Sequence, residues 1–317
     1  MKKWTFWMML SIVAVVLAAC GGSEESQTGA SEEEKQGEEI TITHEYGEAT
    51  VQKNPEKVVV FDFGVLDTLD ELGIEAAGVP QMNIPAYLEK YEGEQYTNVG
   101  SLKEPDFEAI HELQPDVIFI SARQAELYDQ FAEIAPTIFM GLDESQYMES
   151  FKGNMETIGK IFGKEDEVKA ELEAIDQQIA EMNEKTEAMD KKALIVLANE
   201  GKVSAYGPAS RFGWIHDVLG FKPADESIES STHGQGISFE YILETNPDIM
   251  FVIDRSAAIE EKAEPAKEAI ENDLVQKTTA YQEGNIIYLD ADYWYLSGGG
   301  LQSMKAMVKG MEEALNE

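Results

Sequence analysis

The chain has 317 residues, with 24 Lys and Arg against 61 Asp and Glu and a formal net charge of −37. Protein affinity for nucleic acids comes largely from neutralising phosphates with Lys and Arg, so this acidic balance excludes a nucleic-acid binder. A single Cys excludes an internal disulfide framework. The length suffices for about two domains, and 43% hydrophobic residues is an ordinary globular composition.

Residues 1–19 are predicted to be an export signal. Lys2 and Lys3 precede an apolar run at 4–17, which is short for a membrane-spanning helix. The run leads into the sequence LAAC, which resembles a bacterial lipobox, so we expect Cys20 to become a lipidated N-terminus. An ordinary cleavage site followed by an incidental Cys is the alternative.

The segment assigned to residues 20–39 is predicted to be a disordered tether. After its Cys it contains no large apolar residue, so it has no side chains with which to offset the entropy of ordering. A folded body tethered to the extracellular face of the cell membrane is therefore expected.

Two segments, 106–123 and 238–255, repeat one another at an offset of 132 residues, with eight identities in 18 positions. In each copy an N-cap residue (Asp106 or Ser238) predicts a short helix. A Pro-Asp pair predicts the turn that ends this helix, and an apolar run predicts a buried strand. We interpret the pair as an internal duplication; chance likeness of two helix–turn–strand units is the alternative.

Each repeat follows another apolar run, at 58–61 in the first half and 193–197 in the second. Continuous apolar runs are typical of parallel strands covered on both faces. We therefore predict an N-terminal α/β lobe over residues 40–146 and a C-terminal α/β lobe over residues 191–317.

Between these halves, residues 147–190 carry two apolar stripes with helical spacing, divided near Gly163. This pattern predicts a long interlobe helix packed along both lobes. The expected fold class is thus α/β, with two Rossmann-like lobes joined by a long helix, and the natural ligand site is the cleft between the lobes.

The chain contains only three Arg, at positions 123, 211 and 255, beside 21 Lys. Arg123 and Arg255 occupy the same register of the repeat, just past equivalent strands, at the sheet edge where α/β proteins bind ligands. Arg211 lies in a loop after a predicted hairpin. Guanidinium groups grip anionic oxygens in a fixed geometry, so the three residues predict an anionic ligand of about three negative charges. Ordinary salt bridges to the abundant carboxylates are the alternative.

Aromatic residues point to the same place. Trp214 lies three residues from Arg211, and Trp294 and Tyr295 lie in the segment DYWYLSGGG between a predicted strand and a final helix. Such side chains suit a planar aromatic ligand, and the glycine run at 298–300 is expected to start the helix with free N–H groups. Core packing beside a glycine hinge is the alternative for Trp294.

His233 lies in the polar loop STHGQG and is either a metal ligand or an exposed side chain. The sequence has no HExxH motif, Cys/His cluster, nucleophile elbow or P-loop, so an enzyme is not predicted.

Taken together, the lipobox, tether, repeats and interlobe helix resemble the iron-siderophore substrate-binding lipoproteins of ABC importers. Six segments carry a closer similarity to the petrobactin-binding members of that family, over essentially the whole mature chain. They are FDFGVLDTLDELG (61–73), VGSLKEPDFEAI (99–110), ISARQ (120–124), STHGQ (231–235), FVIDR (251–255) and WYLSGGGLQS (294–303).

The resemblance implies a class III binding-protein fold with two lobes that barely hinge. It implies a ferric catecholate, petrobactin or its dihydroxybenzoyl fragments, as transported cargo rather than a permanent cofactor. The arginine cluster would bind this ligand together with Trp294 and Tyr295. His233 and Tyr295 would complete iron coordination when the siderophore is tetradentate, with Tyr293 left open as an alternative to Tyr295; ferric iron suits phenolate oxygen.

The resemblance also implies a monomer that docks its permease through one surface Glu on each lobe. These positions match Glu108 and Glu240, which the repeat makes equivalent independently. Two anionic groups about a lobe apart would engage two basic pockets of the transporter, although each Glu also favours the first turn of its own helix. Haem or a corrinoid is the alternative ligand class.

Overall fold

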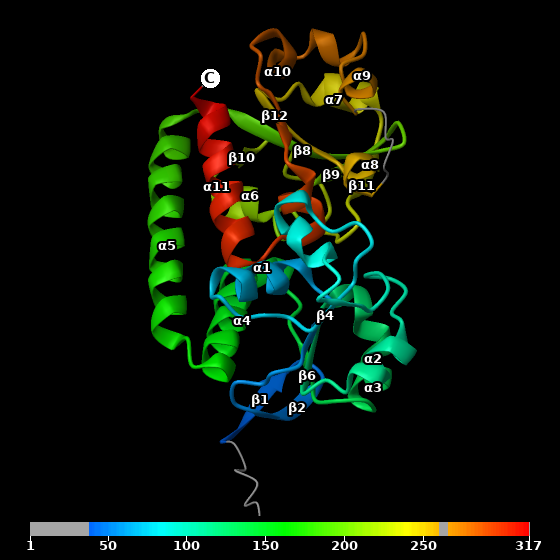
Figure 1. Cartoon of the computed structure of the whole chain (residues 1–317). Coiled ribbons are helices and arrows are strands. Elements are labelled where there is room, and N and C mark those ends of the chain that lie inside the picture. The colour runs from blue at the N-terminus through cyan, green and yellow to red at the C-terminus, as the bar shows by residue number, and fades with distance from the viewer. Residues whose placement is uncertain (1–37, 260–265, 317) are drawn as a thin grey trace, which may run out of the picture. The chain divides into compact units, whose positions relative to one another are not determined.

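The computed structural model describes residues 38–259 and 266–316, which belong to one compact unit (Figure 1). The predicted signal peptide, Cys20 and nearly all of the tether lie outside the described residues. The first strand already begins at Glu39, the last residue that the sequence assigned to the tether. Within 38–259 and 266–316, no helix is both long and apolar enough to cross a membrane.

The first half contains a parallel five-stranded sheet in the order β5-β4-β3-β6-β7. Its strands are β3 (Val58–Val60), β4 (Gly78–Val79), β5 (Thr97–Asn98), β6 (Val117–Ile120) and β7 (Thr137–Phe139). The helices of this half are α1 (Phe63–Glu71), η1 (Ala86–Glu92), α2 (Phe107–Leu113), η2 (Ala122–Leu127), α3 (Tyr128–Ala132) and η3 (Glu144–Gln146). An antiparallel hairpin, β1 (Glu39–His44) and β2 (Gly47–Gln52), precedes the sheet.

The second half contains a six-stranded sheet in the order β11-β9-β8-β12-β13, with β10 also paired to β8. Its strands are β8 (Lys192–Asn199), β9 (Lys202–Tyr206), β10 (Lys222–Pro223), β11 (Gln235–Ile237), β12 (Ile249–Asp254) and β13 (Ile286–Leu289). Strands β8, β10, β12 and β13 are parallel, whereas β9 is antiparallel to its neighbours. The helices of this half are α6 (Trp214–Asp217), α7 (Phe239–Thr245), α8 (Arg255–Ile259), α9 (Ala266–Ile270), η4 (Val275–Lys277), α10 (Thr279–Gln282) and η5 (Asp292–Ser297).

The two repeat copies begin with the predicted caps. The Asp106 carboxylate accepts hydrogen bonds from the N–H groups of Glu108 and Ala109 at the start of α2. The Ser238 hydroxyl accepts the N–H of Tyr241 at the start of α7. Both helices therefore begin where the sequence places them.

The copies also end alike. Gln114 and Asn246, each just before the Pro-Asp pair, adopt left-handed φ values of 51° and 47° and end α2 and α7. The aspartates of the two pairs, Asp116 and Asp248, accept the backbone N–H groups of Lys57 and Lys192 at 2.7 and 2.8 Å, at the starts of β3 and β8, which pair with β6 and β12. Each turn thus ties its helix to the neighbouring strand.

The predicted interlobe segment forms two helices, α4 (Tyr147–Phe162) and α5 (Glu165–Ala188), separated at the left-handed Gly163. The last helix, α11 (Leu301–Leu315), packs against both α5 and α1. Figure 1 shows α5 and α11 side by side. Helices from the first half and from the connecting segment therefore both contact this helix of the second half.

Alternate residues of the central strands enter different clusters of the core. In β8, Ile195 belongs to a large cluster, whereas Leu194 and Val196 belong to a second one. In β6, Phe119 joins the same large cluster, and Ile118 packs in a third. Because one cluster takes side chains from both sheets, both halves share a continuous apolar core. The strands are covered on both faces, as their apolar runs predicted.

Candidate ligand cleft

A cavity of about 360 Å³ lies between the two halves, a size typical of small-molecule sites. Both halves contribute polar and aromatic side chains to its wall. They include Asp62, Lys103, Arg123, Glu144 and Tyr147 from the first part of the chain and Arg211, Trp214, Thr232, His233, Trp294 and Tyr295 from the second.

The three arginines lie where the sequence placed them. Arg123 is in η2, directly after β6, and Arg255 begins α8, directly after β12. Arg211 lies in the loop between the β8–β9 hairpin and α6. Parallel strands deliver the first two side chains to matching edges of their sheets.

Tyr295 brings the three guanidinium groups together. Arg123 and Arg211 each donate from Nη2 to the backbone carbonyl of Tyr295 at 2.8 Å. Arg255 donates from Nε to the Tyr295 hydroxyl at 2.8 Å and from Nη1 to Asn199 Oδ1 at 2.6 Å. Tyr295 belongs to η5, a single turn of π-helix, a feature that is frequent at functional sites.

The arginines do not serve as ion-pair partners for the surface carboxylates. In the part of the chain that the structure describes, every ion pair within 4.0 Å uses a lysine. The salt-bridge alternative for the three arginines is therefore wrong at that distance. Arg123 and Arg211 line the cavity, whereas Arg255 is not among its lining residues and is linked to it through Tyr295. The hydrogen bonds of the three guanidinium groups go to neutral oxygens of Tyr295 and Asn199.

Asp62 is partly buried, lies nearby and balances part of this charge. Burial and the neighbouring Arg211 lower the pKa of Arg123, whereas Asp62 raises it. Burial raises the pKa of Asp62 itself, against a hydrogen bond from the Ser121 hydroxyl at 2.7 Å and the charge of Arg123. Asp62 also caps α1 by accepting the N–H of Val65.

Burial is the largest single influence on the pKa of the Tyr295 phenol and raises it, but the hydrogen bond from Arg255 and the nearby arginine charges together outweigh burial. The charges of Arg211, Arg255 and Arg123 act in the same direction, so the pKa of Tyr295 is lowered from its ordinary value. An oxygen with a lowered pKa beside three cations is suited to contact a metal complex.

The two tryptophans stack on one another, with ring centroids 5.0 Å apart and planes at 15°. Tyr147 also stacks on Trp214, with ring centroids 5.4 Å apart and planes at 10°. Trp294 is only 5% exposed, so core packing uses most of its surface even though it lines the cleft. A small part of the indole is left for a ligand.

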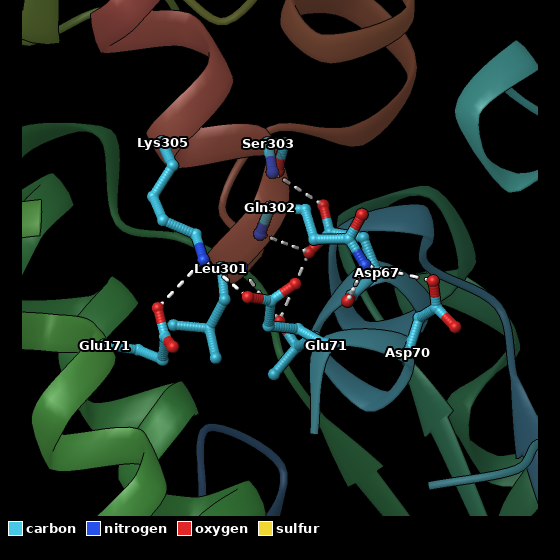
Figure 2. Close-up of polar contacts among 9 residues, drawn as sticks. Asp67, Asp70, Glu71, Glu171, Leu301, Gln302, Ser303 and Lys305 are labelled. Carbon is cyan, nitrogen blue, oxygen red and sulfur yellow. Dashed lines mark hydrogen bonds and ion pairs between the residues drawn. The ribbon is translucent and has the colours of Figure 1, made fainter. Parts of the chain in front are cut away.

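The glycine run does not start α11 with free N–H groups, and that prediction is wrong. Figure 2 shows the start of α11 against Asp67 of α1. The Thr68 hydroxyl of α1 accepts the N–H of Leu301 at 3.0 Å. The Asp67 carboxylate accepts the N–H groups of Gln302 and Ser303 at 3.2 and 3.1 Å. The helix start is a joint between the two halves rather than an anion site.

The other predicted site residues differ in whether they reach the cleft. His233 is exposed on the turn before β11 and lines the cleft, as does Tyr295, whereas Tyr293 packs on Tyr87 with ring centroids 4.5 Å apart. Among the described residues, no group of three His, Cys, Asp or Glu side chains could hold a metal ion. Glu108 and Glu240 are exposed in the first turns of α2 and α7.

Sequence reasoning missed several charged residues of the cleft. Asp62 had a detectable signal, because an Asp directly before an apolar helical run is an N-cap pattern. Lys103 and Glu144 lie in loop or 3-10 segments with no recognisable pattern, so only the folded arrangement reveals them.

The sequence of this chain is similar to those of known binding proteins. A family model described as "Periplasmic binding protein" matches residues 58–293. The chain is 51% identical over 321 residues to the petrobactin-binding protein YclQ of Bacillus subtilis, covering 100% of both. It is 33% identical over 274 residues to the ferric-anguibactin-binding protein FatB of Vibrio anguillarum, covering 85% of each.

Solved structures agree with these matches. The crystal structure of YclQ from Bacillus subtilis superposes with a TM-score of 0.86 at 54% identity, covering 88% of this chain and 99% of that one. The periplasmic catecholate-siderophore binding protein VctP from Vibrio cholerae superposes with a TM-score of 0.83 at 37% identity, covering 87% and 100%. The resemblance inferred from the motifs and the predicted fold class are confirmed.

Proposed function

The chain belongs to the periplasmic binding protein family, and from that premise we propose that it captures a ferric catecholate siderophore. Petrobactin, which the name of the relative YclQ specifies, is the first candidate. The protein would deliver this cargo to the permease of an ABC importer without converting it chemically.

One observation carries the proposal: three arginines gather at Tyr295 with no carboxylate at ion-pair distance among the described residues. Like charges repel, so this grouping is stabilised when an anion enters the cleft. Catecholate oxygens leave a ferric complex with net negative charge, and guanidinium groups bind such oxygens in a fixed geometry.

The proposed contacts extend to the aromatic wall. Trp294 and Tyr295 would pack against the catechol rings, and His233 with Tyr295 would coordinate iron when the siderophore leaves sites open. Haem and corrinoids are less favoured, because the named relatives bind petrobactin and ferric anguibactin.

We further propose an extracellular, monomeric protein held to the cell membrane by a lipid on Cys20. The support is the lipobox-like sequence before that residue and the polar segment that follows it. Permease docking would use Glu108 and Glu240, which are exposed at equivalent positions of α2 and α7.

Tryptophan fluorescence tests the binding function, because Trp214 and Trp294 adjoin the cleft. Ferric petrobactin is expected to quench the emission at stoichiometric concentration, whereas a ferric hydroxamate and haemin are not. Ala in place of Arg123, Arg211 or Arg255 should each weaken binding by roughly 10- to 150-fold, the equivalent of about 1.5–3 kcal/mol for a charged hydrogen bond.

The exposed Lys309, which pairs only with Glu313 on α11 among the described residues, provides the control. Lys309→Ala removes the same charge far from the arginine cluster and should leave the affinity unchanged. Unaltered affinity in all three arginine variants would remove the anion argument.

A further inference from the structure

Glu144 places a carboxylate in the wall of a cleft that otherwise suits an anion. It is the first residue of η3 and lines the same cavity as Arg123 and Arg211. A negative charge here repels the ferric core that the arginines attract. Its presence therefore calls for a role other than binding the anionic part of the ligand.

Local structure does not require this carboxylate. The preceding Asp143 caps η3 by accepting the backbone N–H and the hydroxyl of Ser145 at 2.9 and 2.7 Å, and it also accepts a bond from the Gln146 amide. Glu144 takes no part in this cap. No Lys or Arg among the described residues lies within 4.0 Å of its oxygens.

Glu144 instead points across the cleft. Its Oε2 accepts a hydrogen bond from the Thr232 hydroxyl at 3.1 Å, from the turn before β11 in the other half. Burial raises the pKa of Glu144, while Thr232 and the charges of Arg211 and His233 lower it. An ionised carboxylate accepts about four hydrogen bonds, so its oxygens retain capacity for a donor on a ligand.

We infer that Glu144 is a specificity-determining residue that accepts a protonated amine or N–H donor of the siderophore, while the arginines hold its ferric catecholate core. The inference rests on the proposed function and adds a second chemical requirement to it. A ligand with a cationic group beside its anionic core would satisfy both the arginines and Glu144. A purely anionic complex gains from the arginines but is disfavoured by Glu144.

The test uses two ferric catecholate complexes that differ only in the substituent on one linker nitrogen, which is a secondary amine in one and an N-acetyl amide in the other. The wild-type protein should bind the amine form more tightly. Glu144→Gln keeps the size of the side chain and removes its charge. It should weaken binding of the amine form by roughly tenfold and leave the acetylated form unchanged or tighter.

Thr232→Val is the matched control, because it removes the cross-cleft hydrogen bond and leaves the carboxylate. It should retain the wild-type preference. The inference is overturned if the wild type shows no preference for the amine form, or if Glu144→Gln changes the affinity for both complexes equally. It is also overturned if Thr232→Val abolishes the preference to the same extent as Glu144→Gln. Wild-type protein that binds neither complex would refute the proposed function as well. Binding of both with no effect of Glu144→Gln would refute the role of Glu144 alone.

Discussion

At the scale of single residues, Tyr295 organises the cleft, because two of its oxygen atoms accept hydrogen bonds from three arginines. Its carbonyl receives Arg123 and Arg211, and its hydroxyl receives Arg255. A neutral carbonyl holds the guanidinium groups in place without cancelling their charge, whereas a carboxylate would neutralise them. The arrangement is preorganised for an anion and leaves most of the attraction for the guest.

The pKa of the Tyr295 phenol depends on its contacts with the three arginines. The pKa of its phenol is lowered by Arg255 and the neighbouring arginines against the effect of burial, so Tyr295 should ionise ahead of the buried tyrosines as pH rises. Arg255→Ala is expected to raise this pKa. Tyrosinate absorbance measured against pH, with Tyr295→Phe to identify the signal, checks this. Superimposable titration curves for the wild type and Arg255→Ala would contradict it.

At the scale of elements, α11 is fastened to two other helices. Figure 2 shows Lys305 of α11 between Glu71 of α1 and Glu171 of α5, at 2.6 and 2.8 Å. The Asp67 carboxylate caps the start of the same helix and accepts the Tyr87 hydroxyl at 3.0 Å. Tyr87 also contacts Ser297 at the end of η5, so this joint reaches the segment that carries Tyr295.

Asp67 should make stability depend on pH. Burial raises its pKa from 3.8 to about 7, against hydrogen bonds from Ser303, Tyr87 and Gln302. The folded protein then binds this proton more tightly than the unfolded chain. The contribution of Asp67 to the free energy of unfolding is therefore full below about pH 4 and is lost as pH rises through about 7. The change corresponds to about 4 kcal/mol at most.

Urea unfolding at several pH values between about 4 and 8 checks this sign. Asp67→Asn removes the titration, so the stability of the wild type relative to this variant should fall across that range. Glu313→Gln, at an exposed position of α11, should show no such trend. Parallel pH profiles for the wild type and Asp67→Asn would rule out a raised pKa.

The sequence was sufficient to predict features that depend on residues close together in the chain. The caps at Asp106 and Ser238, the break at Gly163 and the strand after each Pro-Asp pair all depend on local hydrogen bonds and periodicity. Matched positions in the repeat also placed Arg123 and Arg255 at equivalent strand ends.

Contacts between residues far apart in the sequence could not be predicted from local sequence patterns. Nothing near the glycine run indicates that Asp67, 235 residues before Gln302, occupies the N–H groups at the start of α11. The bond between Glu144 and Thr232 joins positions 88 residues apart. Such pairs are selected by packing of the whole chain, which periodicity and turn residues do not encode.

At the scale of the whole molecule, one apolar core joins the two sheets and the connecting helices. Separating the halves would expose buried side chains to water, at about 25 cal/mol for each Å² of apolar surface. The two exposed glutamates at the repeat positions, Glu108 and Glu240, lie on different halves that share this core. Two such groups on one molecule would favour bivalent engagement of a partner.

The variant with Ala at both Glu108 and Glu240 should bind ferric siderophore normally and fail to support its uptake. Iron-uptake assays in cells that depend on this protein, paired with fluorescence titration of the purified variant, separate the two effects. Ala at both Glu112 and Glu244, exposed one turn later on the same helices, is the matched control. Normal uptake by the Glu108 and Glu240 variant would refute docking through these residues.

Helix α11 is the element that both α1 and α5 contact. Without it, Asp67 and Thr68 would lack their partners at its start, and the shared core would lose the side chains of Leu301, Met304, Met307, Val308 and Met311. A truncation before residue 301 would therefore leave two halves without the helix that joins them, rather than a slightly shortened protein.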